Sequence, residues 1–206
     1  MRALVFVHRS SCFHIGHVGW AFEWHRGYFN AGAVENWRSL PINPPETMDF
    51  WTAKTLDPVA AMRRYEYDAY KIIEVPDAQP EAAWKTVCWV GQQRYIVVGR
   101  NCMDDTYDVL RAYGVTTLPL PARSLLPNRW FDLIAGKALP TSACVALEGW
   151  GRLLWAIPRL RERACPIETD GIAPPPWHTE GSSPWEAVRE AMAHLLHGQG
   201  DATSNP

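Results

Sequence analysis

The chain has 206 residues, of which 47% are hydrophobic and 20% are charged, and both values lie near the averages of globular proteins. This composition excludes a mainly disordered chain, and the length suffices for one domain with a substantial core or for a domain with an appendage. The formal net charge of -2 gives no broad electrostatic footprint for nucleic acid or an anionic membrane. We therefore expect neither nucleic acid nor a membrane as a partner.

No stretch of the sequence approaches the roughly 20 apolar residues that a membrane span needs, and the apolar run at the start is too short for a signal sequence. The five cysteines are odd in number, widely spaced and contain no C-x-x-C pair. We therefore expect reduced thiols in a cytoplasmic protein. The eleven tryptophans are unusually many, and we expect them to line the core and a groove.

The N-terminal segment predicts a strand followed by a hairpin. Residues 2–7 are apolar and indicate a buried strand, and a polar loop follows at 9–16. Large apolar and smaller residues alternate through 17–24, which is typical of a strand. Residues 25–27 form a loop that ends in a glycine suited to a left-handed conformation, and 28–36 form the returning strand.

The middle of the chain predicts a mixture of helices and strands. Residues 37–56 are rich in proline and predict an irregular segment anchored by Trp37, Phe50 and Trp51. The elements expected after it are a short helix within 56–70, a strand at 70–75, a helix at 80–93, a strand at 94–99, a helix at 101–114 and a short helix at 127–134.

A different organisation is expected beyond residue 140. Residues 143–163 predict a helix interrupted at Pro158, 172–178 an extended proline-rich linker, and 184–197 an amphipathic helix. That last helix either packs on the body of the protein or binds a protein partner. The expected units are a domain at 1–140, a helical C-terminal extension at 141–198 and a disordered tail at 199–206.

Cys102 is a candidate nucleophile because it opens a helix that directly follows a predicted strand. Asn101 suits the N-cap of this helix, and Gly114 suits its C-terminal end. At a helix start, the unsatisfied N–H groups and the helix dipole stabilise a thiolate, which lowers the pKa of the thiol. The alternative interpretation of Cys102 is a buried structural cysteine.

A nucleophilic cysteine needs a base, and the base needs a third group that orients it. His17 begins the first hairpin strand on a face that carries glycine and alanine, which leaves room for the cysteine helix. If the loop has three residues, the numbers of facing residues sum to 52, and Glu35 lies opposite His17. A two-residue loop would place Asn36 there instead, and Asn30 is another residue that could orient the imidazole.

Cys12, His14 and His17 form a C-x-H-x-x-H pattern that suggests a metal site. Zinc sites usually combine two separated pairs of ligands, and the sequence offers no matching second pair. We therefore expect no metal and no other cofactor.

Two segments carry a family resemblance, GHVGWAF at 16–22 and YIVVGRNCMDDTYDVLRAYG at 95–114. Together they resemble circularly permuted papain-like cysteine hydrolases, namely the permuted NlpC/P60 group and the PPPDE-type deSUMOylating isopeptidases. In these families the histidine strand precedes the cysteine helix. The resemblance implies an α+β fold in which an antiparallel sheet packs against the helix of Cys102, with Cys102 as nucleophile and His17 as base. The residues after Cys102 differ from the His-Phe of the isopeptidases, which leaves the substrate open.

The residues and the resemblance together predict a cytoplasmic cysteine hydrolase that cleaves an amide or isopeptide bond of a peptide or protein. Cys102, His17 and Glu35 are the expected catalytic residues, and Trp20, Asn101, Trp37 and Trp51 are expected to bind substrate. Transfer of the acyl group to an acceptor stays open beside hydrolysis. The alternative function is a catalytically silent papain-like fold that serves as a protein-binding module.

Overall fold

The computed structural model describes residues 1–25, 27–35, 42–43, 49–96, 100–124, 126–142, 163–164 and 174–175. The strands are β1 (Arg2–His8), β2 (His17–Glu23), β3 (Phe29–Glu35), β4 (Ile42–Asn43), β5 (Asp49–Thr55), β6 (Ala69–Glu74), β7 (Tyr95–Ile96), β8 (Leu139–Pro140) and β9 (Arg163–Ala164). The helices are α1 (Ser11–His14), α2 (Pro58–Arg64), α3 (Pro80–Val90), α4 (Cys102–Tyr113), the 3-10 turn η2 (Pro121–Arg123) and α5 (Pro127–Leu133).

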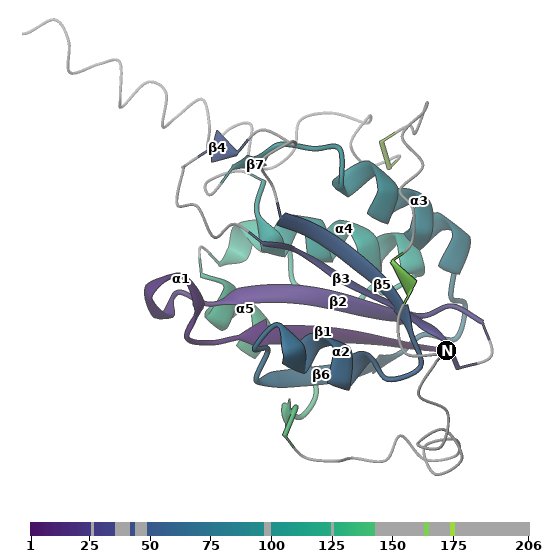
Figure 1. Cartoon of the computed structure of the whole chain (residues 1–206), viewed down its shortest axis with the longest axis horizontal. Coiled ribbons are helices and arrows are strands. Elements are labelled where there is room, and N and C mark those ends of the chain that lie inside the picture. Colours follow the sequence, from purple (N-terminus) through teal and green to yellow (C-terminus); the bar gives the residue numbers. More distant parts are fainter. Residues whose placement is uncertain are drawn as a thin grey trace, which may run out of the picture.

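Within these residues, seven strands form one sheet in the order β8-β6-β1-β2-β3-β5-β9, and every neighbouring pair is antiparallel. Strands β4 and β7 form a separate antiparallel pair. The long central strands and the helices around them are seen in Figure 1. The expected α+β class with an antiparallel sheet is therefore confirmed.

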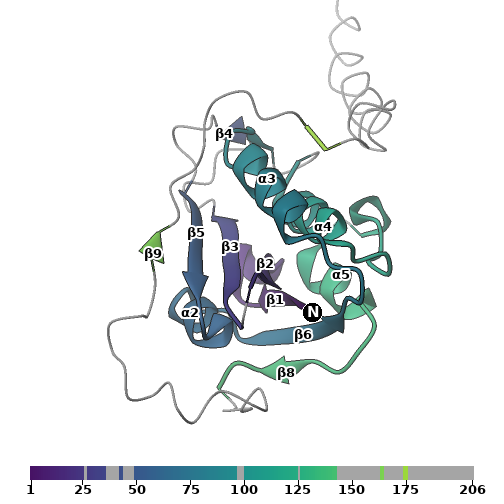
Figure 2. The same cartoon turned by 90° about the vertical axis from the view of Figure 1, so that its right-hand side faces the viewer.

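The sheet is covered on both faces, so its central strands are apolar in nearly every residue. One core, here called the α4-side core, lies between the sheet and the helices α3, α4 and α5, and it contains Val18 and Trp20. The other, the α2-side core, contains Phe6, Ala21 and Met62 of α2. Figure 2 shows α3, α4 and α5 together on one side of the sheet and α2 away from them, beside β5 and β6.

The register of the first hairpin is the predicted one. Trp20 pairs with Gly32 and Ala21 with Ala31, so the numbers of facing residues sum to 52. Gly27 has φ +80°, the left-handed conformation expected at the end of the loop.

The prediction of an irregular segment at 37–56 is wrong for its last part, because residues 49–55 form β5. Phe50 and Thr52 lie on one side of this strand, Trp51 and Ala53 on the other, and β5 pairs along all of β3. Pairing with β3 decides the conformation of this segment, whereas the neighbouring prolines suggested a loop. The helix expected within 56–70 is confirmed at its start, where the Asp57 side chain accepts a hydrogen bond from the Ala60 N–H, but it already ends at Arg64.

Most of the expected C-terminal extension lies outside the described residues, as do the helix expected at 184–197 and the tail at 199–206. Of the expected extension, Arg163 and Ala164 pair with β5 at the edge of the sheet. Among the described residues, none of the helices is both long and apolar enough to cross a membrane.

Candidate active site

Cys102 is the first residue of α4, and the residues around it fix where the helix begins. Asn101 Oδ1 accepts a hydrogen bond from the Met103 N–H at 2.9 Å, and the Asp104 carboxylate accepts one from the Asn101 N–H at 3.1 Å. This capping box, with Gly114 at φ +109° at the other end, confirms the predicted helix. Asn101, expected to bind substrate, is buried, and its side chain caps the helix.

The thiol of Cys102 is enclosed, since the residue is 2% exposed. Burial raises the pKa of Cys102, and this effect outweighs the hydrogen bonds from the Val18 N–H and the Tyr95 hydroxyl, which favour the thiolate. The expected lowering of the thiol pKa at the helix start is therefore wrong, because removing the sulfur from water costs more than the helix start contributes. The resting thiol keeps its proton.

The sulfur meets β2 at the place where that strand stops pairing with β3. The Trp24 N–H, just after β2, donates a hydrogen bond to the Tyr28 carbonyl at 2.6 Å. Along a strand, every second N–H group points to the same neighbouring strand. The Val18 N–H, six residues before Trp24, therefore also points toward β3. The pairing of β2 with β3, however, ends at Trp20. The Val18 N–H therefore acts on the sulfur of Cys102.

His17 points to the opposite face of β2. It is 3% exposed, and its ring centroid lies 6.1 Å from that of Tyr67, a residue of the α2-side core. His8, paired with His17 across the sheet, lies at the same centroid distance from Tyr67. Cys102 and Val18 belong to the α4-side core. The imidazole of His17 and the thiol of Cys102 thus lie on opposite faces of the sheet, at the beginning of β2.

The strip of glycine and alanine on the His17 face packs against α2. A Cβ atom on Gly19 would lie 2.7 Å from the Met62 Cε and 2.9 Å from the Gly32 oxygen, so this side is already filled. Helix α4 packs on the face of Val18 and Trp20, whose larger side chains bury more apolar area against it. The prediction that the cysteine helix packs on the strip is therefore wrong.

The residues proposed to orient His17 differ in what the structure describes. The pairing of β2 with β3 ends at Trp20 and Gly32, so it does not reach His17 and Glu35, and the Glu35 backbone pairs with Asp49 of β5. The side chain of Glu35 lies outside the described residues, and so does Asn36. Asn30 is buried on the other face, where it accepts a hydrogen bond from the Trp20 indole N–H at 3.3 Å and donates one to Thr52 at 2.7 Å.

The expected substrate-binding tryptophans have different environments. Trp20 is fully buried and packs near Phe50, with ring centroids 6.3 Å apart. Trp51 is half-buried on β5 and stacks on Tyr65 with centroids 4.0 Å apart. Trp37 lies outside the described residues. Trp20 therefore contributes to the core in this structure, and Trp51 is the described tryptophan of this set with exposed surface.

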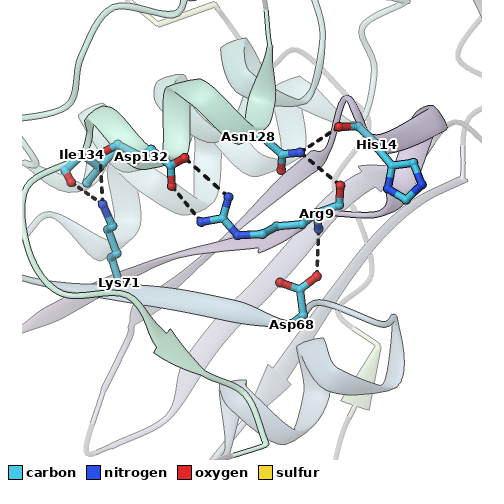
Figure 3. A network of polar contacts seen from close by, with 7 residues as sticks. All are labelled: Arg9, His14, Asp68, Lys71, Asn128, Asp132 and Ile134. Carbon is cyan, nitrogen blue, oxygen red and sulfur yellow. Dashed lines mark hydrogen bonds and ion pairs between the residues drawn. The ribbon is translucent and has the colours of Figure 1, made fainter.

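The loop before His17 is held by a network that sequence reasoning missed (Figure 3). The Asn128 side chain donates hydrogen bonds to the carbonyl oxygens of Arg9 at 3.0 Å and His14 at 2.9 Å. Cys12 and His14 have positive φ values of 51° and 67°, which is unfavourable for residues with a Cβ atom. The sequence showed that residues 9–16 form a polar loop, but no neighbouring residue indicated that Asn128 would hold it.

A second missed group lies on α4. Arg100 contacts Asp105 and Asp108, and both carboxylates are buried. Cys102 and Asp105 are three residues apart, as are Asp105 and Asp108, so each pair consists of neighbours on the surface of the helix. That spacing was visible in the sequence, but sequence reasoning did not use it.

Among the described residues, no three His, Cys, Asp or Glu side chains come close enough together to hold a metal ion. Comparisons with protein-family models, curated proteins and solved structures give no match for this chain.

Proposed function

We propose that this protein is a thiol hydrolase that cleaves an amide or isopeptide bond in a peptide or protein, with Cys102 as nucleophile and His17 as base. The observation that carries the proposal is the place where the sulfur meets β2. Cys102 opens α4, and its sulfur lies against the N–H of Val18, the residue that directly follows His17. Two residues 85 positions apart in the sequence are thereby held at one end of one strand.

The arrangement supports a permuted papain-like fold. The histidine strand β2 precedes the cysteine helix α4, and the helix packs on that strand. Glu35, the last residue of β3, is the proposed orienting residue. Cys12, Cys88 and Cys102 are free thiols, which suits the reducing cytoplasm as the proposed location.

In this mechanism His17 takes the proton of the Cys102 thiol while the sulfur attacks the carbonyl carbon of the substrate. The Cys102 backbone N–H at the start of α4 stabilises the negative charge that develops on the carbonyl oxygen, because the Met103 N–H already donates to Asn101. His17 then gives the proton to the leaving amine, and a thioester remains on Cys102. Water attacks the thioester with His17 as base, which releases the acid and restores the thiol.

The resting structure sets two conditions for this mechanism. The thiol is protonated because burial raises its pKa, so its proton must leave during the attack instead of before it. The two groups are 2% and 3% exposed and lie on opposite faces of β2, so the end of this strand must rearrange when substrate binds. Each condition makes the reaction slow without a substrate that opens the site.

The same burial favours a second candidate function, a catalytically silent fold that binds a protein partner. An enclosed, protonated thiol next to Val18 is also what a packing cysteine requires. In that case Cys102 contributes apolar surface to the α4-side core and reacts with no acyl donor.

The two candidates are distinguished by trapping an acyl-enzyme. The folded protein is incubated with p-nitrophenyl acetate, an activated ester, and the peptides are then examined by mass spectrometry. The hydrolase predicts an acetyl group on Cys102 that forms and is lost again as nitrophenol release continues. In Cys102→Ser this steady release disappears, whereas Cys88→Ser, a matched buried cysteine, leaves it unchanged. Acetylation confined to exposed Cys12 contradicts the hydrolase and supports the binding module.

A further inference from the structure

One side of α4 carries a buried cluster of charges, here called the Arg100 cluster and made of Arg100, Asp105 and Asp108. Arg100 Nη2 lies 2.8 Å from Asp105 Oδ1, and Nη1 lies 3.3 Å from Asp108 Oδ2. The carboxylate side chains are 3% and 5% exposed. One cation thus faces two carboxylates in a region with little access to water.

The contact between Arg100 and Asp105 is close but poorly directed. The two atoms form an ion pair, yet neither Nη2 of Arg100 nor Oδ1 of Asp105 has a hydrogen bond among the described residues. A buried carboxylate oxygen whose partner is poorly directed is less stable in its charged form than one in water. Accordingly, burial raises the pKa of Asp105 to about 7, even though Arg100 acts to lower it. Asp105 therefore titrates near neutral pH.

Arg100 joins this cluster to the elements around the thiol. Its backbone exchanges two hydrogen bonds with Ile96 of β7, at 2.7 and 3.2 Å, and Ile96 directly follows Tyr95. Its guanidinium carbon lies 4.1 Å from the ring centroid of Trp89 on α3. Arg100 also immediately precedes the capping residue Asn101. The charge cluster and the start of α4 are thus one packed unit.

Asp105 lies one helical turn after Cys102, on the same side of α4. The charges that act on Asp105 are those of Arg100, Asp104 and Asp108. Cys12 and Asp105 each disfavour ionisation of Cys102, and both also disfavour ionisation of the Tyr95 hydroxyl, because every such ionisation adds a second negative charge nearby. Trp89, the neighbour from α3, adds no charge.

We propose that Asp105 is a positioning residue that controls Cys102 through charge: when Asp105 is ionised it holds the thiol neutral, and when Asp105 takes up a proton the thiolate forms more readily. The inference deepens the proposed function, because it concerns the thiol assigned there as nucleophile. In this inference the Arg100 cluster sets how readily the Cys102 thiol ionises. The proton that Asp105 takes up comes from solvent, and the proton of the Cys102 thiol goes to His17, as in the proposed mechanism.

The test compares alkylation of Cys102 by iodoacetamide in wild type and in Asp105→Asn across pH, with peptide mapping to separate the cysteines. Below the pKa of Asp105 the wild-type carboxyl is neutral like the amide, so the two rates converge near about pH 5.5. Near about pH 8.5 the wild-type carboxylate is charged, and Asp105→Asn reacts about threefold faster or more, since a tenfold rate change corresponds to one pKa unit. The ratio of the two rates therefore rises with pH.

Two controls make this result specific. Asp108→Asn removes a carboxylate from the same arginine but one turn farther from the sulfur, and its rate ratio should rise much less. Cys88, buried in α3, reports general opening of the protein in the same sample.

Several outcomes would overturn the inference. A rate ratio that stays constant with pH would mean that Asp105→Asn only loosens the structure, and a ratio of one throughout would mean that Asp105 does not act on the thiol. An equal effect of Asp108→Asn would remove the assignment to Asp105. Because alkylation needs no turnover, the protein could prove inactive as a hydrolase and the inference about Asp105 would still stand or fall by this measurement.

Discussion

The sulfur of Cys102 meets the backbone N–H of Val18, at the point where β2 has stopped pairing with β3. This contact has two opposite consequences for a reaction at Cys102. It holds the start of α4 against the strand that carries His17, and it also encloses the thiol, whose pKa burial raises. A reaction at Cys102 therefore depends on how easily the beginning of β2 and the loop before it can move.

The first prediction concerns that loop. Asn128→Ala removes two hydrogen bonds to the carbonyl oxygens of Arg9 and His14, which hold the unfavourable backbone of Cys12 and His14 in place. We expect it to lower the free energy of unfolding by about 1–3 kcal/mol and to speed proteolysis within 9–16. Both effects are measured by urea denaturation and by limited digestion with mapping of the cleavage sites.

Arg9→Ala is the matched control for the loop. It removes an ion pair with Asp132, at 2.7 Å, whose side chains are 41% and 59% exposed, so its cost should stay below about 1 kcal/mol. If Arg9→Ala destabilised the protein as much as Asn128→Ala, the loop would depend on the surface ion pair and not on the amide.

The second prediction concerns the close packing of α2 on the strip of small residues. In Gly19→Ala the added methyl group would lie 2.7 Å from the Met62 Cε and 2.9 Å from the Gly32 oxygen, and the oxygen belongs to the backbone of β3. We expect a loss of stability of about 1–3 kcal/mol from overpacking, measured by thermal or urea unfolding.

Gly27→Ala separates packing from backbone strain. A Cβ atom at Gly27 meets nothing within 4 Å, but φ is +80°, so the cost is that of a left-handed residue alone, about 1 kcal/mol. Equal losses in the two variants would show that the contact of Gly19 with α2 is looser than the structure indicates.

The third prediction concerns the pH dependence of stability. Burial raises the pKa of Asp105 to about 7 in the folded protein, against an ordinary value of 3.8. Between these values the folded protein keeps a proton that the unfolded chain releases, so the contribution of Asp105 to stability is greatest at the low-pH end and is lost as pH rises to about 7. Wild type should therefore lose stability relative to Asp105→Asn over this range, as followed by urea midpoints at a series of pH values. A difference between the two proteins that does not change with pH would contradict the raised pKa.

The sequence was most informative where local chemistry decides the structure. Asn101, Asp104 and Gly114 specify the ends of α4 through capping alone, and Gly27 specifies the loop of the hairpin. A three-residue loop requires the numbers of facing residues to sum to 52, and Trp20 does pair with Gly32. These features depend on a few neighbouring residues, which is why they could be predicted.

The sequence was misleading where distant elements compete for one surface. Alternation along β2 defined its two faces correctly, but it could not tell which face α2 would take and which α4 would take. The choice depends on total buried area, and the face of Val18 and Trp20 offers more of it to a long helix. The ionisation of Cys102 was mispredicted for the same reason, since a helix start acts locally whereas burial is a property of the whole core.

The central claim is that Cys102 and His17 act as one unit, and the rate at which p-nitrophenyl acetate acetylates Cys102 tests it most directly. The comparison uses wild type, His17→Ala, and His17→Gln, which keeps most of the side-chain volume but cannot take the proton. The account predicts that the acetylation rate falls about a hundredfold or more in both variants, as is typical of a missing general base. The control His14→Ala alters an exposed histidine and should leave the rate within about twofold of wild type. An acetylation rate at Cys102 that is unchanged in His17→Gln would contradict the claim.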